Sequence, residues 1–133
     1  MPRFIRLVPI LLFAACGPST RFTTEQVPTL TTIEDVMWAQ SQAADPQFKK
    51  IGAASYSDDD YAQLTALAAR IGATTAKVKK DFSKGPAFDA FAETLSGHAK
   101  ELGDAAAAKD QAKSSLALQS MKDTCKACHK QFK

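Results

Sequence analysis

The sequence predicts an all-α protein, an antiparallel up-down-up-down four-helix bundle, on three observations. Its 133 residues are enough for one small domain. Alanine is abundant while Val, Ile, Tyr and Trp are scarce, a composition that favours helices over strands. Apolar residues recur at steps of three and four in four segments joined by short links, and no segment alternates as a strand would. The content of 45% hydrophobic and 23% charged residues excludes a disordered chain, and a net charge of +3 is too small for a nucleic-acid-binding protein.

The first 15 residues have the pattern of a secretory signal peptide. Two arginines precede an apolar run of about ten residues that ends in two alanines, and a membrane span would need about 20. Cys16 follows, in a segment that resembles the lipobox of bacterial lipoproteins, whose cysteine is lipidated and becomes the mature N-terminus. We therefore expect a lipoprotein signal peptide over 1–15 and lipid anchoring on the periplasmic side of a bacterial membrane. Gly17 favours the outer membrane, and a plain signal peptide that yields a soluble periplasmic protein is the alternative.

Residues 16–30 are expected to form the lipidated N-terminus and a flexible tether, because Thr, Pro and Gly are frequent there and apolar residues have no period. The helical domain is expected over 31–133. Its first helix begins at Thr31-Thr32-Ile33-Glu34, which has the pattern of a capping box, and Asp45-Pro46 should kink or interrupt it. Its buried face is predicted to contain Ile33, Met37, Gln40, Ala44, Phe48 and Ile51.

The second helix is predicted to begin at Ser57, followed by three aspartates that suit the positive end of a helix; a calcium loop would need wider ligand spacing. Its apolar face comprises Leu64, Leu67/Ala68, Ile71, Thr75, Val78 and Phe82.

The segment 83–86 then breaks the chain, and Pro86 is placed to open the third helix. The buried face of this helix is predicted to contain Phe88, Phe91, Leu95, His98 and Leu102. The fourth helix starts at about Asp110, and its predicted face carries Leu118, Met121, Cys125, Cys128 and Phe132.

The fourth helix contains the motif Cys125-Lys126-Ala127-Cys128-His129, which is typical of c-type haem attachment. Two thiols three residues apart lie on one side of a helix and can form thioethers to the two vinyl groups of one porphyrin. The adjacent histidine can then serve as the proximal iron ligand. Since the two cysteines lie on the predicted buried face, we expect the haem inside the bundle.

Other interpretations of the motif have less support. A C-x-x-C redox pair belongs to a βαβ context, which this chain lacks. Zinc held by the two cysteines, His129 and His98 is conceivable. A disulfide between Cys125 and Cys128 within a helix would be geometrically poor.

A signal peptide, four amphipathic helices and C-x-x-C-H near the end of the last one resemble the cytochrome c′ family over residues 31–133. The resemblance implies a monohaem domain with one covalent haem c, and it allows a homodimer formed through the first two helices. The family commonly follows its haem histidine with Tyr and Arg, where this chain has Phe132 and Lys133.

In the family the first helix supplies the residue on the distal side of the iron. Met37 occupies that helix here, so the resemblance implies a His/Met-ligated iron suited to electron transfer. A space-filling Met37, distal ligation by His98 and an open five-coordinate iron remain alternatives. Met121 is expected to line the pocket, and Trp38 to pack at the bundle edge or near the haem rim.

Four lysines step along the haem helix in one stripe, either as a steering surface for an acidic redox partner or as an ordinary solvated face: Lys122, Lys126, Lys130 and Lys133. The three cysteines thus divide into Cys16 for lipid and Cys125 and Cys128 for haem. We expect a periplasm-facing monohaem cytochrome that carries single electrons between unidentified redox partner proteins and catalyses no reaction itself. The alternative function is a five-coordinate haem protein that binds small gases such as NO or CO.

Overall fold

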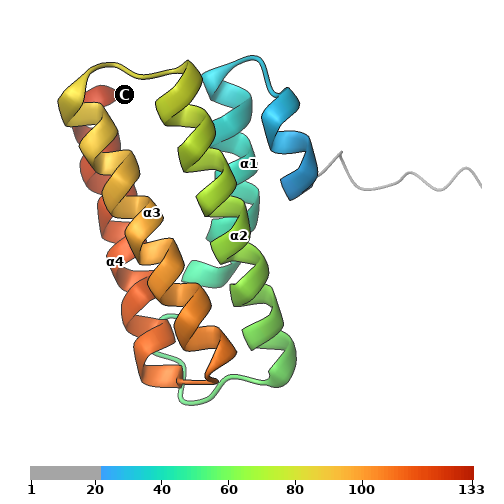
Figure 1. Cartoon of the computed structure of the whole chain (residues 1–133). Coiled ribbons are helices and arrows are strands. Elements are labelled where there is room, and N and C mark those ends of the chain that lie inside the picture. Colours follow the sequence, from blue (N-terminus) through green and yellow to red (C-terminus); the bar gives the residue numbers. More distant parts are fainter. Residues whose placement is uncertain (1–21) are drawn as a thin grey trace, which may run out of the picture.

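The computed structural model describes residues 22–133, so the predicted signal peptide and the predicted lipidation site at Cys16 lie outside the described residues. The described chain consists of a short 3-10 helix and four α-helices: η1 (Thr24–Thr29), α1 (Ile33–Phe48), α2 (Asp58–Asp81), α3 (Pro86–Ala107) and α4 (Gln111–Phe132). The α-helices run alternately up and down and pack as one bundle (Figure 1). No strand occurs within residues 22–133, and the predicted all-α four-helix bundle is confirmed. None of the described helices is long and apolar enough to cross a membrane.

The helix starts follow the local capping signals, with one shift in register. Ser57 caps α2, where its hydroxyl accepts a hydrogen bond from the Asp60 amide at 3.1 Å and its own amide donates to the Asp60 carboxylate at 2.8 Å. At α1 the cap is Thr32, whose Oγ1 accepts from the Asp35 amide at 3.1 Å, so the helix starts one residue later than the predicted capping box. Pro86 opens α3 as predicted, directly after Gly85, whose φ of +104° is accessible mainly to glycine.

Pro46 does not interrupt α1 but lies in its last turn. The helix runs through it without a break and ends at Phe48. A proline lacks the N–H that would bond the Gln42 carbonyl one turn earlier, but only two residues of the helix follow it. Ile51, predicted on the face of this helix, lies instead in the turn that follows it.

The expected tether is shorter than predicted, because the chain folds onto the bundle before residue 31. Val27 in η1 and Leu30 just after it are buried. Two long α2 side chains hold the segment, since the Arg70 Nε donates to Thr24 Oγ1 at 3.0 Å and the Lys77 Nζ donates to the Pro28 carbonyl at 3.0 Å. Thr- and Pro-rich composition alone gave no sign of these contacts, which depend on side chains of a distant helix.

Two groups of buried side chains form the core. One contains Leu64, Ile71, Leu102, Leu118 and Met121 among others, and the second is built around Val36, Ala39, Val78, Phe88 and Ala92. Cys125 packs against the first group and Cys128 against the second. The haem-attachment motif therefore lies where the two parts of the core meet.

Candidate functional site

Helix α4 carries the C-x-x-C-H motif in its last two turns, in the register that the sequence predicts. Cys125 and Cys128 are three residues apart, both are partly buried, and no disulfide joins them. His129 directly follows and is exposed to the space beside the helix. The thiols and the imidazole thus project from one end of a regular helix, which holds them at fixed spacing.

Burial raises the pKa of the Cys125 thiol to about 11, and the nearby Cys128 and the charge of Asp45 act in the same direction. Burial also raises the pKa of Cys128, while the Lys84 ammonium acts against this rise. Both groups are therefore neutral thiols at pH 7. Reactive redox cysteines depend on the thiolate form, so this environment does not resemble that of an activated thiol pair.

Two adjoining cavities open beside the motif, with volumes of about 470 Å³ and about 250 Å³. Cys128 borders the larger cavity and Cys125 the smaller, while Met37, Gln40 and His129 border both. Because three residues are shared, the cavities form one interrupted space along α4.

The wall of the larger cavity is mostly apolar, with polar groups confined to a few positions. Its apolar lining residues are Ile33, Met37, Val78, Phe88, Phe91, Ala92, Leu95 and Phe132. The rings of Phe88 and Phe91 meet the Phe132 ring edge-on, at centroid distances of 5.2 and 6.1 Å. Lys84 lies over the Phe88 ring, 5.7 Å from its centroid, at the edge of this cavity.

Met37 lies on α1, across this space from the haem-attachment helix. Its side chain is partly buried and packs against the second core group. It shares both cavities with His129. The structure thus brings together Met37, Cys125, Cys128 and His129, which the sequence analysis chose from two distant segments.

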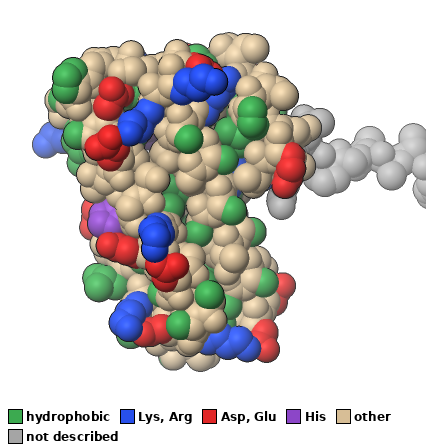
Figure 2. All heavy atoms as spheres, viewed as in Figure 1, with side chains coloured by type: hydrophobic (Ala, Val, Ile, Leu, Met, Phe, Trp, Pro, Cys, Tyr) green, Lys and Arg blue, Asp and Glu red, His purple; other side chains and the backbone are tan. Residues whose placement is uncertain are grey.

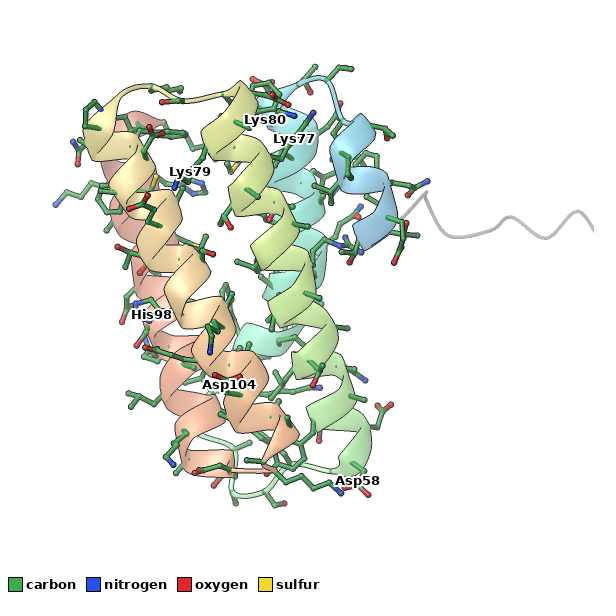
Figure 3. The ribbon with its side chains drawn as sticks, in the orientation of Figure 1. Asp58, Lys77, Lys79, Lys80, His98 and Asp104 are labelled. Atoms are coloured by element: carbon green, nitrogen blue, oxygen red, sulfur yellow. The ribbon has the colours of Figure 1, made fainter. Side chains whose placement is uncertain are left out.

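His98 does not join this group. The buried face of α3 passes through Phe88, Ala92, Leu95, Ala99 and Leu102, which places His98 beside the core rather than in it. It lies on the outer side of α3 (Figure 3), where its Nδ1 is 3.0 Å from a carboxylate oxygen of Glu101. His98 borders neither cavity, and no cluster of three or more potential metal-ligating side chains exists within the described residues.

Two further expectations about the pocket change. Met121 was expected to line it, but its side chain is completely buried in the first core group and borders neither cavity. Trp38 lies at the bundle edge, half exposed, with its ring edge-on to Phe22 at a centroid distance of 6.0 Å. It does not border either cavity, so the expectation of an edge position is met and a position near the haem site is not.

Sequence reasoning missed the role of Gln40, which it assigned only to the helix face. Gln40 is nine-tenths buried and borders both cavities. Its Nε2 donates to Thr74 Oγ1 at 3.0 Å, and the Thr74 hydroxyl donates in turn to the Arg70 carbonyl at 2.9 Å. A polar residue on an otherwise apolar face was the available signal, because a buried amide requires a partner.

The residues present fit a covalently bound porphyrin. A volume of about 470 Å³ lies within the range of roughly 300–1,000 Å³ typical of cofactor sites, and its walls are aromatic and aliphatic as in such sites. Two protonated thiols, an imidazole and a thioether border the space, which is the set of groups that c-type haem uses.

A four-helix bundle with C-x-x-C-H at a mostly apolar cavity has the features of a c-type haem protein. The family model described as Cytochrome C' matches residues 59–133, more than half of the chain. The chain belongs to the cytochrome c′ family, and its cofactor is a covalently attached haem c. Neither the curated proteins nor the solved structures that were compared with this chain include a match.

Proposed function

We propose that this haem-binding cytochrome carries single electrons and has no catalytic activity of its own. In this proposal Cys125 and Cys128 hold the haem through thioethers, His129 is the proximal iron ligand and Met37 is the distal ligand. The observation that carries it is that Met37 on α1 and His129 on α4 border the same two cavities. When bound, the haem supplies an iron that accepts and releases one electron.

The chain's own residues support this role in three ways. The thiols of Cys125 and Cys128, one in each part of the cavity space, fix the cofactor to a helix and prevent its loss. Met37 and His129 together would hold the haem iron with a thioether and an imidazole, which would raise its reduction potential and would leave no position for a substrate or gas. The phenylalanine side chains give the larger cavity an apolar wall, which would lower the local dielectric on that side of a bound haem.

Absorption spectra of the purified full-length holoprotein, ferric and ferrous, with and without carbon monoxide, test the ligation. We expect low-spin spectra that carbon monoxide does not change. Met37→Ala should open the iron, so that the ferrous variant binds the gas. His98→Ala is the matched control, because His98 borders neither cavity, and its spectra should equal those of the wild type.

Each other outcome has a clear meaning. A wild-type protein that is high-spin and binds carbon monoxide refutes Met37 ligation and supports the gas-binding alternative. Loss of the low-spin spectrum in His98→Ala, with Met37→Ala unchanged, assigns the distal position to the histidine instead. A protein without covalently retained haem after Cys125→Ser/Cys128→Ser, but with it before, supports the thioether assignment.

We also propose that the protein faces the periplasm, because covalent haem attachment takes place there, and that lipid on Cys16 anchors it. The support for the lipid anchor is the sequence of residues 1–16 alone. Intact mass measurement of protein extracted from membranes should show loss of residues 1–15 and added acyl groups. A soluble protein with a free thiol at Cys16 would contradict the lipid anchor.

The resemblance also allows a homodimer. Sedimentation measured over a range of protein concentrations tests whether it forms.

A further inference from the structure

Positive charge is concentrated on the helix that carries the haem-attachment motif. Three of the 17 basic residues lie within residues 1–21, so residues 22–133 hold 14 basic against 14 acidic side chains. Within this domain the segment 122–133 carries four lysines and a single acidic side chain, Asp123. The rest of the described chain therefore has an equal excess of negative charge. The positive charge of the domain is concentrated at the C-terminal half of α4.

All lysines that form ion pairs with described residues lie outside segment 122–133, although Lys49, Lys80 and Lys84 form none either. Six lysines of the described chain each contact a carboxylate within 3.1 Å: Lys50, Lys77, Lys79, Lys100, Lys109 and Lys113. On the face that Figure 2 shows, blue and red side chains lie next to one another, and Figure 3 labels Lys79 and Asp104 from two of these pairs. No lysine of segment 122–133 forms an ion pair with a described residue. Asp123 accepts hydrogen bonds from the Gln119 amide instead, at 2.9 Å.

The positions of these lysines relate them to the haem site. Lys122 and Lys126 border the smaller cavity, which one carboxylate, Asp45, also borders. Lys130 directly follows His129 in the chain, and Lys126 and Lys130 are exposed. We call Lys122, Lys126 and Lys130, spaced four residues apart on one side of α4, the lysine stripe.

Stabilisation of the helix end does not account for the stripe. Cations stabilise a helix C-terminus only weakly, and the effect is confined to the last turn. Lys122 and Lys126 lie more than one turn before the end of α4 at Phe132. The last turn already has Lys84, whose Nζ is 3.5 Å from the Phe132 carbonyl.

We infer that the lysine stripe is the docking surface for an anionic redox partner, such as the acidic face of an electron-transfer protein. This inference rests on the proposed electron-carrying function and adds the place where electrons enter or leave. A patch of one sign attracts an oppositely charged partner and raises its association rate by about tenfold or more, in a salt-dependent way. A partner docked on the stripe lies against the helix that bears the haem-attachment motif, which shortens the path to the cofactor.

The experiment uses the reduced full-length holoprotein and two inorganic oxidants of opposite charge. One electron passes from the protein to ferricyanide, a trianion that becomes ferrocyanide, or to tris(phenanthroline)cobalt(III), a trication that becomes cobalt(II). Stopped-flow rates are measured from low to high ionic strength. We expect the ferricyanide rate to fall as salt is added and the cobalt rate to rise.

The variant Lys126→Gln/Lys130→Gln should slow ferricyanide oxidation about threefold or more at low ionic strength and have little effect at high salt. The matched control Lys109→Gln/Lys113→Gln removes the same charge at the opposite end of α4, beside its first residue Gln111. We expect the control variant to react as the wild type does. Reduction potential and absorption spectra are recorded for each variant.

Four results overturn the inference. Equal slowing in both variants would mean that net charge acts, and not the stripe. An altered potential or spectrum in Lys126→Gln/Lys130→Gln, with unchanged salt dependence, would assign the lysines to the haem's own propionates. Failure of both oxidants to react would refute the proposed electron carrier together with the inference, whereas fast oxidation that is insensitive to charge would refute the inference alone.

Discussion

The buried hydrogen bond between Gln40 and Thr74 joins α1 to α2 beside the cavities, and its two partners should respond unequally to mutation. Thr74 is completely buried and Gln40 is nine-tenths buried. The Gln40 Nε2 donates to Thr74 Oγ1, and the Thr74 hydroxyl donates its own proton to backbone carbonyls of α2. Thr74→Val therefore leaves the Gln40 amide without its acceptor, while Gln40→Leu leaves the Thr74 hydroxyl still hydrogen-bonded.

The difference between the two variants can be estimated from this geometry. An unsatisfied buried donor costs about 1–3 kcal/mol, so Thr74→Val should lower the free energy of unfolding by that amount. Gln40→Leu loses one net hydrogen bond, about 0.5–1.5 kcal/mol, and part of this loss is offset by the apolar side chain. In the double variant neither partner is orphaned, so its cost should be close to that of Gln40→Leu alone. The coupling energy of the cycle is then about 1 kcal/mol or more.

Denaturant unfolding of the full-length holoprotein, followed by circular dichroism, measures all four free energies. Wild type, both single variants and the double variant should share one slope against denaturant, so that the midpoints report stability. Because Met37 lies one turn before Gln40 on α1, carbon monoxide binding by each variant shows whether the haem ligation also loosens. Single costs that simply add, or a Thr74→Val that costs no more than Gln40→Leu, would refute the reasoning.

Three further predictions concern the bundle itself. Leu118→Ala, at a completely buried core position, should lower the free energy of unfolding by about 2–5 kcal/mol in denaturant melts. Gly85→Ala should destabilise the protein by about 1 kcal/mol, because φ is +104° there. Gly97→Ala, in the interior of α3 with open space around it, should stabilise the protein by about 0.5–1 kcal/mol. Changes of the same sign in the free energy of unfolding of the two variants would contradict this. The hydrogen bond from Lys50, followed by those from the helix cap, lowers the pKa of Asp60 from 3.8 to about 2. Because its pKa is lower in the folded state, the ionised Asp60 stabilises the fold above about pH 4, and this contribution is lost as the pH falls from 4 to 2. The difference in free energy of unfolding between wild type and Asp60→Asn should therefore disappear over that range.

Helix positions could be predicted because their signals are local. Ser57 with its aspartates and Pro86 after Gly85 act on their own backbone, and the structure starts α2 and α3 there. The face of α3 could not be predicted equally well. A face that passes through Phe91 and His98 and a face that passes through Ala92 and Ala99 both have the helical period. Alanine is common on exposed and buried faces alike, so the sequence did not favour the second face. Tertiary packing chose the second face, which moved His98 out of the core.

The sequence by itself determined the covalent chemistry of this protein. Two cysteines and a histidine within five residues of one helix keep their relative positions in any fold that leaves the helix intact. Only the tertiary structure decided what faces them, because the rotation and height of each helix depend on the packing of all the others. This packing buried Met121, kept His98 outside, and placed Met37 and Gln40 at the cavities beside His129. It also left the lysine stripe without carboxylate partners among the described residues, which no pattern within α4 alone could show.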